Sequence, residues 1–148
     1  MNKHDFLGGS DGWQGNRKSA MWNPELDQWT LMADMDSMRR YHGCGILTRQ
    51  GRIYVLVAGG QFERSSSLYD VSTNTWTRAG DMSHIRSGGQ MLNGELMAGG
   101  WTSDYEGDVH DTIERFDFET RQCSNTQIKM KSARTFFAAV AVDRTTFC

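Results

Sequence analysis

The chain has 148 residues, a formal net charge of −2 and 38% hydrophobic residues, with 16 glycines and one proline. Its charges are interspersed, which argues against a nucleic-acid surface or a polybasic membrane patch, and no apolar run approaches the roughly 18 residues that cross a bilayer. The three cysteines, Cys44, Cys123 and Cys148, are too few for a disulfide framework. We therefore expect one globular domain, or part of one, in a reducing, cytoplasmic setting.

Short apolar stretches separated by turn residues predict β-strands along the chain. Residues 5–9 are expected to form a strand that ends in a glycine doublet. Residues 43–48 and 52–58 should form two strands, and the second is an apolar run typical of a strand covered on both faces. Further strands are expected near 67–71 and from Trp76 onward, after a turn at 72–75. Residues 136–142 are expected to form the last strand.

A pattern recurs along the chain about every 47 residues. Each copy begins with a glycine doublet: Gly8-Gly9, Gly59-Gly60 and Gly99-Gly100. An aromatic residue follows each doublet, and a second conspicuous residue lies seven positions later: Trp22 and Trp29, Tyr69 and Trp76, Phe116 and Cys123. A methionine then precedes an arginine by four positions: Met35 and Arg39, Met82 and Arg86, Met130 and Arg134. A period of this length is typical of repeat folds.

This pattern resembles the Kelch repeat family, most closely over residues 53–60 (IYVLVAGG), 68–76 (LYDVSTNTW) and 82–86 (MSHIR). Trp22, Phe116 and Cys123 depart from the family's tyrosine and tryptophan. The resemblance implies an all-β fold, a Kelch-type β-propeller segment of about three blades of four-stranded antiparallel sheet. The expected division is a partial blade at 1–35, blades at 36–82 and 83–130, and the first strand of a next blade at 131–148.

Three blades are fewer than the roughly four to eight that close a propeller. Two explanations are open. The chain is part of a longer Kelch protein with further blades on both sides, or two chains form a homodimer that completes a six-bladed ring. We favour the first, because the last strand and the outer sheets would otherwise be exposed edges.

The resemblance places partner binding on the loops that follow the doublets and on the loops that join successive blades. The expected partner-binding residues on these loops are Ser10, Arg39, Arg40, Gln61, Arg86, Trp101, Tyr105 and Arg134. Trp101 and Tyr105 would be buried by the partner, and the arginines would bind carboxylates of an acidic motif. An architectural role is an equally weighted alternative for the repeated arginines. Arg40 and Trp101 break the repeat and are the stronger candidates.

The sequence lacks the nucleophile elbow, the phosphate loop and the paired histidines or cysteines of common catalytic sites. Asp108, His110 and Asp111 have no recognised metal-ligand spacing, so we expect no enzyme activity, cofactor or metal. The resemblance implies a module that recognises a partner protein or peptide, as in the substrate adaptors of cullin-type ubiquitin ligases. The alternatives are a carbohydrate-active or copper oxidoreductase propeller and an actin-binding scaffold.

Overall fold

The structure, a computed structural model, describes residues 4–7, 9–10, 14–102 and 107–141. These residues form β-strands joined by turns and loops, and they contain no helix. Accordingly, no described helix is long and apolar enough to cross a membrane. The strands are β1 (His4–Leu7), β2 (Ser19–Asn23), β3 (Gln28–Leu31), β4 (Gly43–Arg49), β5 (Arg52–Ala58), β6 (Ser66–Asp70), β7 (Thr75–Ala79), β8 (Gln90–Leu92), β9 (Leu96–Ala98), β10 (Thr112–Asp117) and β11 (Gln122–Lys129).

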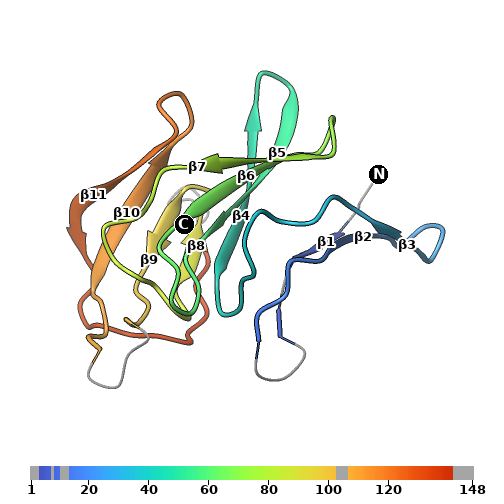
Figure 1. Ribbon diagram of the computed structural model, residues 1–148. Coiled ribbons are helices and arrows are strands. Elements are labelled where there is room, and N and C mark those ends of the chain that lie inside the picture. The colour runs from blue at the N-terminus through green and yellow to red at the C-terminus, as the bar shows by residue number, and fades with distance from the viewer. Residues whose placement is uncertain (1–3, 8, 11–13, 103–106, 142–148) are drawn as a thin grey trace, which may run out of the picture.

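The strands make three antiparallel sheets that follow one another along the chain (Figure 1). The first sheet has three strands in the order β1-β2-β3, and the other two have four strands each, β4-β5-β6-β7 and β8-β9-β10-β11. Sequential strands pair throughout, so each sheet is a simple meander. The first sheet lies at one end of the row, and β10 and β11 lie at the other (Figure 1). The predicted all-β fold with four-stranded antiparallel sheets is confirmed.

The repeated aromatic pairs lie opposite each other across the last two strands of each sheet. In the second sheet, Tyr69 is paired with Trp76, and their ring centroids are 5.0 Å apart. Trp22 and Trp29 are paired in the first sheet, with centroids 6.4 Å apart. Directly opposed residues of an antiparallel pair point to the same face of the sheet. The sequence repeat is therefore a repeat of one cross-strand pair, and in the second and third sheets this pair faces the preceding sheet.

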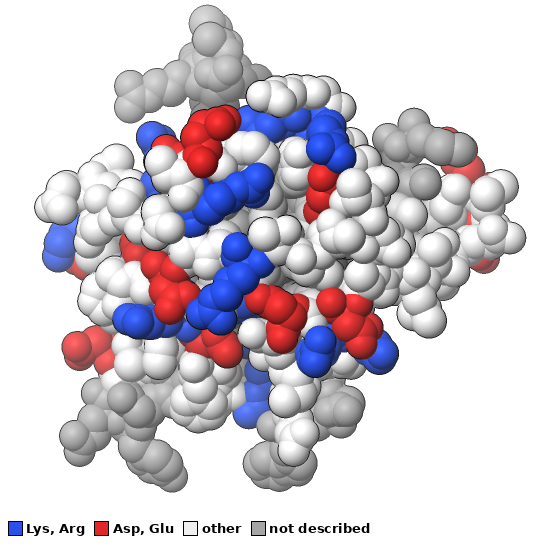
Figure 2. All heavy atoms as spheres, turned by 45° about the horizontal axis from the view of Figure 1, so that its top comes forward, with Lys and Arg blue, Asp and Glu red and all other residues white. Residues whose placement is uncertain are grey.

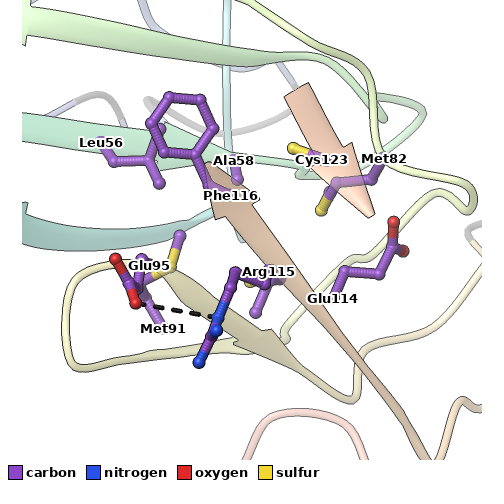
Figure 3. A pocket seen from close by; sticks show the side chains of 10 residues that line it. Leu56, Ala58, Met82, Met91, Glu95, Glu114, Arg115, Phe116 and Cys123 are labelled. Atoms are coloured by element: carbon purple, nitrogen blue, oxygen red, sulfur yellow. Dashed lines mark ion pairs between the residues drawn. The ribbon is translucent and has the colours of Figure 1, made fainter. Parts of the chain in front are cut away.

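The main core lies between the second and third sheets. Leu47, Leu56 and Leu68 of the second sheet pack with Phe116 of β10, and each of these side chains is at most 3% exposed. Figure 3 shows this region, where Phe116 and Cys123 come from the third sheet and Leu56 from the second, around a cavity of about 10 Å³. Burial of a large aromatic side chain is the main favourable contribution that such an interface makes.

Cys123 occupies the place of a tryptophan without losing its polar contact. The Trp76 indole donates its N–H to the carbonyl oxygen of Ala33 at 2.9 Å. The Cys123 thiol makes the corresponding contact one repeat later, 3.5 Å from the carbonyl oxygen of Gly80. Burial raises the pKa of this thiol, so it serves as a packed neutral side chain.

The strand expected over residues 136–142 is not seen in the described part, because residues 131–141 form no strand. A strand needs a ladder partner for its backbone groups, and here these groups bond to a loop instead. The backbone N–H of Phe136 donates to the carbonyl of Gly88 at 2.8 Å, and the Thr135 hydroxyl donates to the carbonyl of Ser87 at 2.7 Å. This segment therefore lies against the loop before β8.

Candidate partner-binding site

The loops that carry the expected site residues gather at one end of the sheets. Each glycine doublet lies against the arginine-bearing loop that leaves its own sheet: the N–H of Gly60 donates to the carbonyl of Arg86 at 3.2 Å, and that of Gly100 to Arg134 at 3.0 Å. Gly59 has a φ of +69°, and a Cβ added there would lie 2.9 Å from the Arg86 carbonyl oxygen. In the second and third doublets, this close approach leaves no room for a side chain.

Arg39 is enclosed by the second sheet rather than offered to a partner. Its side chain is 0% exposed, and one terminal nitrogen donates to the carbonyls of Gly59 and Ser65, both at 2.9 Å. The other terminal nitrogen donates to the hydroxyls of Ser65 at 2.8 Å and Ser67 at 3.3 Å. Burial lowers the pKa of Arg39, partly offset by the charge of Asp36. This arginine joins the first sheet to the doublet of the second.

Arg86 repeats this arrangement one sheet further on and adds a buried ion pair. Its Nε donates to Glu114 at 2.9 Å, and the two side chains are 0% and 1% exposed. Its terminal nitrogens donate to the carbonyls of Gly99 at 2.6 Å and Thr112 at 3.1 Å, and to the Thr112 hydroxyl at 2.6 Å. Arg39 and Arg86 therefore fit the architectural alternative, because their donors are turned into the sheets, away from any partner.

Arg134, the third repeated arginine, differs in being exposed. Its Nη2 donates to the hydroxyl of Ser132 at 2.6 Å, and its guanidinium carbon lies 5.9 Å from the centroid of the Phe137 ring. The described residues contain no doublet beyond it for the guanidinium to reach. Of the three repeated arginines, it is the one whose side chain is exposed.

Arg40 and Gln61 are brought together at the junction of the first and second sheets. The Nε of Arg40 donates to the Oε1 of Gln61, and the Gln61 backbone N–H donates to the Arg40 carbonyl at 3.0 Å. They line a groove of about 230 Å³, open to solvent. The full lining is Gln14, Gly15, Met38, Arg40, Gln61 and Phe62.

Two apolar residues of this groove were not among the expected site residues. Met38 is 57% exposed and Phe62 is 67% exposed. Phe62 has a φ of +61°, a left-handed conformation that is rare for a bulky side chain. Its signal in the sequence was an aromatic residue directly after Gln61 within an otherwise polar loop. Exposed large apolar side chains beside a cation are typical of an interaction surface.

The other expected residues lie in separate places. Trp101 is only partly exposed, because its indole N–H donates to the carbonyl of Gly107 at 2.9 Å and its backbone pairs with that of Ser87. Ser10 is exposed, and its hydroxyl donates to the carbonyl of Gln14 at 2.9 Å. Tyr105 lies outside the described residues. The structure thus groups Arg40 with Gln61, while Trp101 lies on the loop that enters β10.

Two histidines near these loops are held neutral. Burial, followed by the charge of Arg39, lowers the pKa of His42 to about 4. The pKa of His110 is lowered by burial first, and then by the charges of Arg86 and His84. The ring centroids of His110 and His84 are 4.7 Å apart. The described residues contain no group of three or more His, Cys, Asp or Glu side chains that could hold a metal ion.

Charged side chains of both signs lie at the opposite end of the sheets. Figure 2 shows this end, where basic and acidic residues are interspersed. Arg49 and Glu95 lie 2.9 Å apart, and Arg52 and Asp70 lie 3.1 Å apart. Exposed pairs of this kind contribute little to stability, but they leave no single-sign patch on the face shown.

Comparisons with known proteins relate this chain to Kelch-repeat proteins, although no family model matches it. It is 31% identical over 125 residues to F-box/kelch-repeat protein At1g80440 of Arabidopsis thaliana, covering 77% of this chain and 34% of that protein. It is 34% identical over 68 residues to Kelch-like protein 15 of Homo sapiens, covering 43% and 11%. It is 27% identical over 138 residues to alpha-scruin of Limulus polyphemus, covering 84% and 14%.

The solved structure of YjhT superimposes on 85% of this chain and 42% of its own chain, with a TM-score of 0.66 and 12% identity. At that identity the likeness concerns the fold alone. Fold and repeat together define a partial β-propeller. Its repeat is the Kelch repeat, as the sequence pattern predicted and as the similarity to Kelch-repeat proteins shows. The chain spans between 11% and 34% of the length of these curated relatives.

Proposed function

We propose that the chain is a non-catalytic interaction module that binds a segment of a partner protein in the groove between its first and second sheets. The observation that carries this proposal is the composition of that groove. Exposed Met38 and Phe62 provide apolar walls, and Arg40 is the one charged residue among the six that line it. Such a groove suits an apolar side chain next to a carboxylate.

The partner segment is proposed to be acidic because of how Arg40 is held. Its bond to Gln61 fixes the guanidinium at the groove, so less side-chain entropy is lost when a carboxylate binds. A charge-assisted hydrogen bond contributes about 1.5–3 kcal/mol. The apolar walls would add the burial of one or two side chains.

The adaptor role in a cullin-type ubiquitin ligase belongs to this proposal as its more specific form. It is supported by the similarity to Kelch-like protein 15 and to F-box/kelch-repeat protein At1g80440. A homodimer that completes a ring would use other surfaces, at the two ends of the row of sheets, and is a separate proposal.

The test uses fluorescence anisotropy with a labelled decapeptide in which two glutamates precede a leucine. The comparison peptide has lysines in place of the glutamates. We expect the acidic peptide to bind and Arg40→Ala to weaken its binding by about tenfold or more. Phe62→Ser should weaken the binding of both the acidic peptide and an uncharged version of it.

Arg78→Ala is the matched control, because it removes an arginine that is 61% exposed and lies outside the groove. It should leave peptide binding unchanged. Equal losses in Arg40→Ala and Arg78→Ala would mean that the effect is one of overall charge, and the proposed groove would be wrong.

A further inference from the structure

Two aromatic residues occupy a repeat position whose backbone favours glycine. The residue two positions after each repeated arginine is Tyr41, Gly88 or Phe136. All three have a left-handed backbone, with φ values of +59°, +67° and +51°. Glycine adopts this conformation readily, whereas it costs free energy for a bulky side chain. Two of the three repeats therefore depart from the residue that the local backbone favours.

Backbone hydrogen bonds account for this shared conformation without any side chain. The N–H of Gly88 donates to the carbonyl of Tyr41 at 2.8 Å, and the N–H of Phe136 donates to the carbonyl of Gly88 at 2.8 Å. These bonds link each loop to the next, and in the middle loop they form with glycine. The loops thus use the left-handed backbone at this position, but the hydrogen bonds make no use of an aromatic ring.

The two aromatic rings meet beside Gly88. A Cβ added to Gly88 would lie 2.8 Å from the Cδ1 of Phe136, so glycine makes room there for the Phe136 ring. The rings of Tyr41 and Phe136 are in edge-to-face contact, with centroids 5.3 Å apart and an interplanar angle of 87°. Tyr41 is nonetheless 48% exposed. This pair, which we call the aromatic corner, therefore has limited burial to offset the cost of its backbone conformation.

The aromatic corner adjoins the proposed peptide groove through Arg40. The guanidinium carbon of Arg40 lies over the Tyr41 ring, 5.5 Å from its centroid, and the same side chain lines the groove. A cation beside the Tyr41 ring disfavours a second cation from a ligand. The perpendicular rings suit a further aromatic side chain, which can stack on one ring and meet the other at its edge.

We propose that the aromatic corner binds an aromatic side chain of the same partner segment whose carboxylate binds Arg40. This inference rests on the proposed function and specifies the partner further, as an acidic segment that carries an aromatic residue. An extended peptide advances about 3.3 Å per residue. The 5.5 Å between the Arg40 guanidinium and the Tyr41 ring therefore corresponds to about two residues. Tyr41 and Phe136 are retained for binding at a cost in stability.

The binding test compares pairs of labelled decapeptides by fluorescence anisotropy. Each peptide contains two glutamates followed by a leucine, and the members of a pair differ in having tryptophan or serine at one position. That position lies two residues before the glutamates in one pair and two residues after the leucine in the other. We expect one tryptophan peptide to bind about tenfold or more tightly than its serine counterpart.

This ratio of affinities should depend on the two rings. It should fall to about one in Tyr41→Gly and in Phe136→Gly, because the stacking surface is lost. Tyr41→Phe keeps the ring and should retain the ratio. Ile53→Ser is the matched control, because Ile53 is an apolar residue, 49% exposed, near the opposite end of the sheets. It should leave the ratio unchanged.

Urea unfolding supplies a second readout that a packing role would move differently. Tyr41→Gly and Phe136→Gly introduce the residue that the middle repeat already has at this position. Their urea midpoints should therefore equal or exceed that of the unaltered chain, since the left-handed backbone is no longer strained. A marked fall in both midpoints would show that the rings are packing elements and would overturn the proposal.

The ratio also separates this inference from the proposed function. If the serine peptides bind through Arg40 but neither tryptophan peptide binds more tightly, the aromatic corner is wrong and the groove stands. If Arg40→Ala leaves the serine peptides unaffected while a tryptophan peptide binds in a Tyr41-dependent way, the groove is wrong and the aromatic corner stands. No binding of either tryptophan peptide, or a ratio that survives in both glycine variants, would also overturn the inference.

Discussion

Replacing Arg86 by alanine is expected to destabilise the fold far more than replacing an exposed arginine. The Arg86 guanidinium donates hydrogen bonds to Glu114 and to two backbone carbonyls. The side chains of Arg86 and Glu114 are 0% and 1% exposed. Alanine would leave the Glu114 carboxylate buried without its counter-charge. Removing one partner of a buried ion pair costs about 3–5 kcal/mol.

That loss is large against the total stability of a domain, which is about 5–15 kcal/mol. For a chain of this size each kcal/mol lowers the unfolding midpoint by about 2–4 °C, so Arg86→Ala should lower it by about 10 °C. The double variant Arg86→Ala, Glu114→Gln should recover part of the loss, because no unpaired carboxylate remains. The coupling between the two positions should be about 1–3 kcal/mol in a double-mutant cycle.

The assay is urea unfolding followed by tryptophan fluorescence, for both single variants, the double variant and Arg78→Ala. The exposed Arg78 should change the free energy of unfolding by less than about 0.5 kcal/mol. If Arg86→Ala unfolds within about 1 kcal/mol of the unaltered chain, the architectural role of the repeated arginine is refuted.

Further predictions concern the glycine doublets and the buried histidine. Gly59→Ala should cost about 1–3 kcal/mol more than Gly51→Ala in urea unfolding, because an added Cβ meets the Arg86 carbonyl at 2.9 Å at Gly59 and nothing within 4 Å at Gly51; equal costs would contradict the close packing of the doublet. The pKa of His42 falls from 6.5 to about 4 on folding. Between these pH values the unfolded state binds a proton that the folded state does not, so the free energy of unfolding declines as the pH falls from 6.5 towards 4. This loss amounts to about 3 kcal/mol at most and should be missing in His42→Asn; parallel pH dependences of the two chains would show that His42 does not titrate in this way.

The repeat could be predicted from sequence because its chemistry is local to each sheet. The cross-strand pair of Tyr69 and Trp76 needs a fixed separation along the hairpin, and that separation recurs. The expected strands over 43–48 and 52–58 lie within one residue of the observed Gly43–Arg49 and Arg52–Ala58. Apolar periodicity and turn residues were sufficient there, since each strand pairs with its neighbour in sequence.

The role of the repeated arginines could not be decided from the sequence. An arginine that binds a ligand would occupy the same position in the sequence repeat as an arginine that donates to carbonyls of the next doublet. The distinction depends on contacts between sheets, such as Arg39 with Gly59 and Ser65. The groove residues Met38 and Phe62 were missed because each lies in a short polar stretch, where one apolar residue carries no periodic signal.

Mapping where an acidic peptide binds tests the proposed groove most directly. Backbone amide shifts of the isotope-labelled chain would be followed by NMR while the glutamate–leucine decapeptide is added. We expect the perturbed amides to cluster at residues 38–40 and 61–62, around the groove of Arg40 and Phe62. Perturbations concentrated instead at the turns near residues 50–51 and 118–121, at the opposite end of the sheets, would contradict a binding site on the loops.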